Sequence, residues 1–157
     1  THGLIPGDLP GLEEPALALS SPEAAGIEGG TGLLTLSQVL GLKLNAGWVV
    51  LSACNTAAGG GAGSEAVSGL GRAFFYAGAR ALLVTQWPVE STSAAAITTG
   101  AFRLRGAEPG LSRAEALRQA EMEVMERGVF SQGAGPPLFS YAHPLFWAPY
   151  VLAGDGD

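Results

Sequence analysis

The distribution of apolar residues along the chain predicts an α/β protein built around one buried strand. Residues 48–52 predict a strand whose unbroken apolar run, 48–51, is followed by small and polar residues and by Cys54. Such a run is typical of a strand buried on both faces of a mainly parallel sheet. Residues 81–85 form a second run of this kind. Side chains at the carboxyl ends of parallel strands face the crevice where open α/β folds place their sites, which makes Cys54 the first candidate functional residue.

Shorter strands are expected before and after this pair. Residues 15–20 and 32–36 each predict a short strand, and together they predict a hairpin across the long loop between them. Residues 147–152 are aromatic and β-branched, and they predict a strand that closes the sheet. Residues 129–137 are rich in Gly and Pro and predict a loop.

Helical spacing and capping residues predict four helices. N-cap side chains accept backbone N–H groups of the first turn, which favours Ser and Thr there. Ser112 and Glu115 also match the capping box Ser-x-x-Glu. The expected helices are 38–42 after Ser37, one from Ser64 to about Gly78, one from Ser91 or Thr92 to about 104, and one from Ser112 to about 127.

Length and charge narrow the class of protein. The chain of 157 residues is long enough for one domain with a real core. A hydrophobic fraction of 47% excludes global disorder. A net charge of −6 without a Lys/Arg cluster argues against direct binding of nucleic acid or of anionic membranes.

The number of cysteines and the first residues of the chain predict where the protein is located and how much of the domain the chain contains. One cysteine excludes an internal disulfide and a thiolate zinc site, so we expect a reducing, cytoplasmic location and no metal or cofactor. No apolar run approaches the roughly 18 residues of a membrane span. The chain begins at Thr1 without Met or a signal peptide, so we expect one domain over 1–157 that lacks its N-terminal strands.

One histidine and the cysteine form a candidate catalytic pair. Cys54 follows His2 by roughly 50 positions, the separation typical of caspase-type proteases. We expect each residue to close a strand and the two strands to be neighbours, so that both tips meet at one sheet edge. The N–H groups of Gly3 and Cys54 then form an oxyanion hole.

Other interpretations of these residues stay open. A lone cysteine is often a small buried hydrophobe, and a terminal histidine often has no partner. His143 is a rival base, but Pro144 favours an extended backbone there, and a structural role is the preferred interpretation.

Several blocks, in their order, resemble the CHAT domain, a bacterial relative of caspases and separases. The resemblance implies a caspase-like three-layer α/β sandwich with a mainly parallel central sheet, and peptide-bond hydrolysis by a cysteine protease. It implies His2 as general base and Cys54 as nucleophile, with the Gly3 and Cys54 amides holding the oxyanion. The blocks are residues 1–3, 14–19, 32–36, 49–56, 69–74, 78–80, 87–89 and 143–147.

The same resemblance implies partners and a substrate preference. Family members often carry N-terminal helical repeats of the TPR type, and their substrates are proteins or peptides. Related proteases read a basic residue before the cut with an acidic side chain, for which Glu90, Asp155 and Glu14 are candidates beside ordinary surface charges. Trp87 either lines a peptide groove or packs in the core.

Two rival functions remain. One is a catalytically silent CHAT-like interaction or scaffold module. The other is nucleotide binding, because residues 61–66 fit G-x-G-x-x-A ahead of a helix. The glycines do not follow the strand directly and no P-loop lysine is present, so a flexible turn into a capped helix is favoured.

Overall fold

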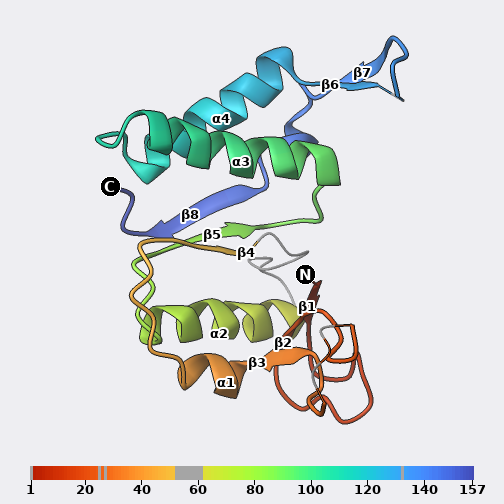
Figure 1. Ribbon diagram of the computed structural model, residues 1–157, viewed down its shortest axis with the longest axis vertical. Helices are drawn as coiled ribbons and strands as arrows, with labels where there is room; N and C mark the ends of the chain where they lie inside the picture. Colours follow the sequence, from red (N-terminus) through yellow and green to blue (C-terminus); the bar gives the residue numbers. More distant parts are fainter. Residues whose placement is uncertain (1, 25, 27, 52–61, 132) are drawn as a thin grey trace. The chain divides into compact units, whose positions relative to one another are not determined.

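The chain folds into two compact units that both mix helices with short strands. The structure, a computed structural model, describes residues 2–24, 26, 28–51, 62–131 and 133–157. The first unit is Thr1–Trp87 and the second is Pro88–Asp157. Their content of helices and small sheets confirms the predicted α/β class (Figure 1).

A three-stranded antiparallel sheet opens the first unit. It consists of β1 (His2–Leu4), β2 (Ala16–Ala18) and β3 (Leu33–Thr35), in the order β1-β2-β3. The β2–β3 pairing confirms the hairpin predicted across the loop of residues 21–32. Ala16 is fully buried, so β2 contributes to the core despite the weak strand propensity of its residues.

Helix α1 (Leu36–Leu40) begins two residues earlier than predicted, because Thr35 and not Ser37 is its N-cap. Thr35 Oγ1 accepts the N–H of Gln38 at 3.3 Å, and Gln38 Oε1 accepts the N–H of Thr35 at 2.9 Å. This reciprocal capping box satisfies two donors at once, which Ser37 cannot do because the residue three positions after it is Leu40.

Ser37 instead fixes the preceding loop. Its N–H and its hydroxyl both donate to Glu14 Oε2, at 2.9 Å and 2.6 Å. Hydrogen bonds from the Ser37 and Thr35 side chains lower the pKa of Glu14. Glu14, one of the candidate specificity residues, is therefore a loop anchor in this structure.

A parallel pair of strands forms the buried part of the first unit. β4 (Val49–Leu51) pairs with β5 (Ala81–Thr85), with Val49 opposite Leu82 and Leu51 opposite Val84. All five residues of β5 are buried. Both predicted central strands are therefore present, and β5 has the predicted bounds. Ser52, the predicted last residue of the first strand, lies outside the described residues.

Helix α2 (Ala62–Tyr76) connects these two strands. It begins before Ser64, so the predicted N-cap at Ser64 is wrong: that residue lies inside the helix. The predicted stop is confirmed, because Gly78 follows the helix with a φ of 105°. A Cβ on Gly78 would lie 2.2 Å from the Leu44 carbonyl oxygen, so only glycine allows this close approach.

Two helices pack together in the second unit: α3 (Ser91–Ala107) and α4 (Arg113–Arg127). The buried residues of α3 are small apart from Ile97, which is fully buried, and those of α4 include Leu117 and Val124. A Cβ on Gly100 would lie 3.2 Å from the Cβ of Ala120, which shows how closely the two backbones approach. The weak amphipathic pattern of α3 reflects this packing through alanine and glycine.

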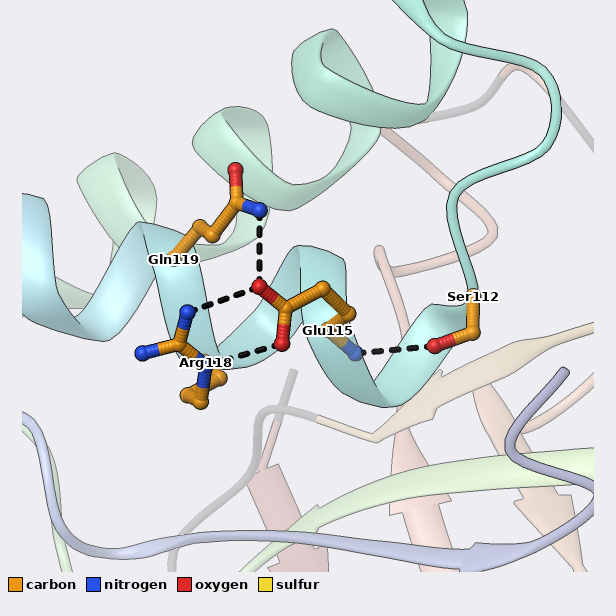
Figure 2. A network of polar contacts seen from close by, with 4 residues as sticks. All are labelled: Ser112, Glu115, Arg118 and Gln119. Carbon is orange, nitrogen blue, oxygen red and sulfur yellow. Dashed lines mark hydrogen bonds and ion pairs between the residues drawn. The ribbon is translucent and has the colours of Figure 1, made fainter.

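The first turn of α4 contains one of the two hydrogen bonds of the predicted capping box (Figure 2). Ser112 Oγ accepts the N–H of Glu115 at 3.1 Å, as predicted. The Glu115 carboxylate does not return to Ser112 but accepts two bonds from Arg118, at 2.8 and 2.7 Å, and one from Gln119 at 2.8 Å. These hydrogen bonds, led by Arg118, lower the pKa of Glu115 to about 2.

The half-buried carboxyl group of Glu121, on α4, lowers the free energy of unfolding by an amount that depends on pH. Burial raises its pKa to about 7 from an ordinary value of 4.5. The folded state therefore disfavours the charged carboxylate, so the cost is absent below about pH 4.5 and is complete above pH 7. We expect Glu121→Gln to raise the free energy of unfolding in urea by about 1 kcal/mol or more at pH 8 and by nothing at pH 4. Glu126→Gln, at an exposed position on the same helix, is the matched control; an equal gain at both pH values would contradict this account.

The end of the chain contains a hairpin where a loop was predicted. β6 (Val129–Ser131) and β7 (Pro137–Ser140) pair antiparallel, with Phe130 opposite Phe139. The rings of this pair stack with centroids 4.9 Å apart, a cross-strand contact that stabilises a hairpin and that the Gly/Pro content of the segment conceals. A short 3₁₀ helix, η1 (Pro144–Phe146), and strand β8 (Tyr150–Gly154) follow. In the described part of the chain, no helix combines the length and the apolar content that crossing a membrane requires.

Candidate active site

His2 is the first residue of β1 and its side chain is exposed. It lies opposite Ala18 of β2, and Gly3 lies opposite Leu17. The prediction that the histidine strand and the cysteine strand are neighbours is wrong for the described strands. β1 pairs with β2, whereas β4, which precedes the cysteine, pairs with β5.

Cys54 lies in the segment 52–61, outside the described residues. The predicted contact between His2 and Cys54, and the oxyanion hole of the Gly3 and Cys54 amides, therefore stay predictions. The strand before the cysteine is well defined, because Leu51 at the end of β4 is buried with 7% of its surface exposed. In the view of Figure 1, β4 and β5 both point toward the side of the first unit on which β1 lies.

Thr85 and Trp87 follow at the carboxyl end of β5. Thr85 is fully buried, an unusual position for a hydroxyl residue, and Trp87 is half-buried at the last position of the first unit. A half-buried indole presents part of its ring to solvent. The predicted contact of Trp87 with a peptide stays a prediction.

Glu90 caps helix α3, a role that we had expected of Ser91 or Thr92. One carboxylate oxygen accepts the N–H of Thr92 at 3.0 Å and the other accepts the N–H of Ser93 at 2.8 Å. Burial alone would raise the pKa of Glu90, but the N–H groups of Ser93 and Thr92 outweigh it, and the pKa is lowered. The carboxylate is therefore charged and held in place, and its predicted contact with a basic substrate residue stays a prediction.

The cap gives a testable stability effect. We expect Glu90→Ala to lower the free energy of unfolding by about 1 kcal/mol at pH 7, because two helix N–H groups lose their acceptor. Since the pKa of Glu90 is depressed, its contribution is present above about pH 4.5 and is lost as the pH falls further. Urea unfolding at pH 7 and pH 3 measures both points, and Glu108→Ala, at the far end of the same helix, is the control. A loss that is equal at both pH values would contradict the assignment of the cap.

Tyr141 is a residue near Glu90 that the sequence does not single out. It is buried with 3% of its surface exposed, and its ring makes edge contacts with Phe139 and Phe146. Burial raises the pKa of the Tyr141 phenol, Thr92 lowers it and Glu90 raises it. The carboxyl end of the β6–β7 hairpin is thereby placed beside the start of α3. No local pattern signals this, because the hairpin itself was expected to be a loop.

Two further candidates make structural contacts. Asp155 forms an ion pair of 3.3 Å with Arg113, whose guanidinium also donates to the carbonyl oxygens of Asp155 and Asp157. His143 Nδ1 accepts the N–H of Leu145 at 3.1 Å and caps η1. The structural role preferred for His143 is therefore the one observed.

The pattern for nucleotide binding does not have the expected geometry in the described residues. Helix α2 begins at Ala62, so Gly63 and Ser64 belong to the helix rather than to a turn before it. Gly61 lies outside the described residues. The part of the chain that the structure describes also contains no group of three His, Cys, Asp or Glu side chains arranged to hold a metal ion.

Together these observations define an α/β protein whose candidate chemistry is that of a cysteine beyond a buried parallel strand, with a histidine on a separate small sheet. The CHAT domain family matches residues 1–155, which include nearly all of both units. The chain belongs to the CHAT domain family, a caspase-like, protease-related family. A comparison with curated proteins gave no match.

Proposed function

We propose that this chain is a cysteine endopeptidase that cleaves peptide bonds with His2 and Cys54. The observation that carries the proposal is the CHAT match over residues 1–155, which includes the His-Gly pair at His2 and the Ser-Ala-Cys run that ends at Cys54. A scaffold module without catalysis needs neither residue. The presence of both favours the enzyme.

The chemistry follows from the two side chains. His2 accepts the proton of the Cys54 thiol, and the thiolate attacks the carbonyl carbon of the substrate. The N–H groups of Gly3 and Cys54 hold the negative oxygen of the tetrahedral intermediate. The imidazolium of His2 then protonates the leaving amine, which leaves an acyl-enzyme. A water molecule that gives its proton to His2 hydrolyses the thioester and restores the thiol.

The structure supports an ordered frame around this site. β5 is fully buried, and His2, at the start of β1, is exposed and so accessible to a substrate. Glu90 and Trp87 follow β5 and are the proposed contacts to the substrate, with the carboxylate reading a basic residue before the cut. We place the protein in a reducing, cytoplasmic compartment, with a protein or peptide substrate and with TPR-type repeats as its regulatory partner.

Covalent labelling tests the proposal. A peptide acyloxymethyl ketone that ends in Arg is incubated with the protein, and the modified residue is identified by mass spectrometry. We expect one adduct, at Cys54, that is lost in His2→Ala and is weak for the same probe ending in Glu. A longer protein that carries this chain, activated by its partner, provides the decisive sample. Absence of an adduct at Cys54 in that sample would rule out the endopeptidase.

A further inference from the structure

The carboxyl-terminal part of the chain is uncharged over a long stretch. Every Asp, Glu, Lys and Arg lies outside residues 129–154, although the chain as a whole has a net charge of −6. This stretch includes β6 and β7. An acidic protein thus contains one long segment at which like-charge repulsion is absent.

The hairpin in this segment exposes apolar side chains. All four residues of β7 are exposed. Leu138 is 60% exposed, Val129 50% and Phe139 42%. Within the second unit, Figure 1 shows the hairpin projecting beyond the ends of α3 and α4. Exposed leucine and valine on a projecting arm are typical of an interaction surface.

The arm is held in shape by its aromatic rings. Phe130 stacks on Phe139 at 4.9 Å, and Phe139 stacks on Phe146 at 5.7 Å. Tyr141 meets Phe146 edge to face at 5.0 Å. These contacts fix one face of the hairpin against η1. The other face, with Leu138, is therefore preorganised, and ordering it costs a partner little conformational entropy.

The hairpin also has open edges. The sheet of β6 and β7 contains two strands in the described part of the chain. The Tyr141 N–H donates to the Gly128 carbonyl at 2.9 Å, so the next pair, Val129 and Ser140, directs its N–H and C=O groups outward. An edge strand with outward donors and acceptors is a template for another strand.

We propose that the hairpin docks a second copy of this chain, with β7 of one copy along β7 of the other. The contact is symmetric, so the same apolar side chains and the same edge groups face each other. Two acidic chains approach most easily through an uncharged surface, and this hairpin is uncharged on both copies. A basic partner would instead be attracted to the acidic surfaces of the protein. Pairing of two copies also extends the two-stranded ribbon by further strands, which stabilises it.

Analytical ultracentrifugation tests the contact. We expect the mass of the protein to rise with concentration from 15.9 kDa toward twice that value. Leu138→Lys is expected to weaken this association at least about tenfold, because two ammonium groups would face each other across the symmetry axis. The substitution makes the chain less acidic overall, so greater net repulsion cannot explain the loss.

Leu40→Lys is the matched control, since Leu40 is exposed to a similar extent on α1 of the other unit. We expect it to associate like the original protein. A mass that stays at 15.9 kDa at sub-millimolar concentration would overturn the proposal. Association that Leu138→Lys leaves unchanged would overturn it as well, because another surface would then carry the contact.

Hydrogen exchange gives a second measurement that needs no variant. The outward N–H of Ser140, on β7, is expected to exchange more slowly as the concentration of the protein rises, whereas the outward N–H of Val129 lies on the opposite edge, on β6, and is expected to keep its rate. The N–H of Tyr141 is bonded within the hairpin and serves as the internal reference. Exchange of Ser140 that is independent of concentration would contradict pairing at the β7 edge.

Discussion

Replacing Cys54 with alanine is expected to lower kcat/KM for peptide hydrolysis by about 10⁴-fold or more, because the covalent route disappears. Replacing His2 with alanine removes the general base and is expected to cost roughly 10²–10⁴-fold. The two residues act as one unit, so the double variant is expected to be no slower than Cys54→Ala. Initial rates with a fluorogenic peptide that carries Arg before the cut measure all three.

His143→Ala is the matched control for this prediction. His143 is the second histidine of the chain, and its ring caps a 3₁₀ helix. We expect its kcat/KM to stay near that of the original protein. Circular dichroism confirms that each variant is folded. A His2→Ala variant with full activity, or a His143→Ala variant with none, would contradict the assignment of the base.

Gly78→Ala is expected to lower the free energy of unfolding by about 3 kcal/mol or more. The φ of Gly78 is +105°, a region that side chains rarely enter. The added Cβ would also lie 2.2 Å from the Leu44 carbonyl oxygen, so the backbone itself must move. The hydrogen bond from Leu44 N–H to Ala77 O, at 2.6 Å, connects the same two segments and would be disturbed.

Gly106→Ala is the control for this effect. Gly106 lies in α3, has an ordinary helical φ and has no atom within 4 Å of the added Cβ. Alanine there is expected to stabilise the helix by about 0.5–1 kcal/mol. Urea unfolding of both variants tests the pair. A Gly78→Ala protein as stable as the original would show that the close approach of this turn to Leu44 is not as described.

The central strands were predictable because each contains a run of consecutive apolar residues, which is typical of a buried strand. The run 81–85 is apolar up to Thr85 and lies between Arg80 and Gln86, and β5 has these bounds. A strand buried on both faces needs no partner to be recognised in the sequence. What the run does not contain is the identity of the neighbouring strand. The expected β1–β4 neighbourhood was therefore wrong, although both strands exist.

The hairpin depends on contacts that no short window of sequence shows, whereas the caps of α1 and α3 are local pairs that we assigned to the wrong residues. Glu90 caps α3 although its side chain is longer than that of a usual N-cap, and Tyr141, the residue after β7, lies beside it. Phe130 and Phe139 meet only once the turn between them is closed. In the hairpin a tertiary contact overrides local propensity. The candidate site is a prediction from its motif, His-Gly and Ser-Ala-Cys, and not from spatial proximity.

The ionisation of Cys54 tests the central claim most directly, because it requires neither a substrate nor a trigger. Iodoacetamide reacts with thiolates, so its rate at pH 6 reports how much of the Cys54 thiol is ionised. If His2 pairs with Cys54, alkylation at pH 6 is at least about tenfold faster than in His2→Ala, and the two rates converge above pH 9. His143→Ala is expected to react like the original protein. Equal rates at pH 6 with and without His2 would contradict the pairing of His2 with Cys54.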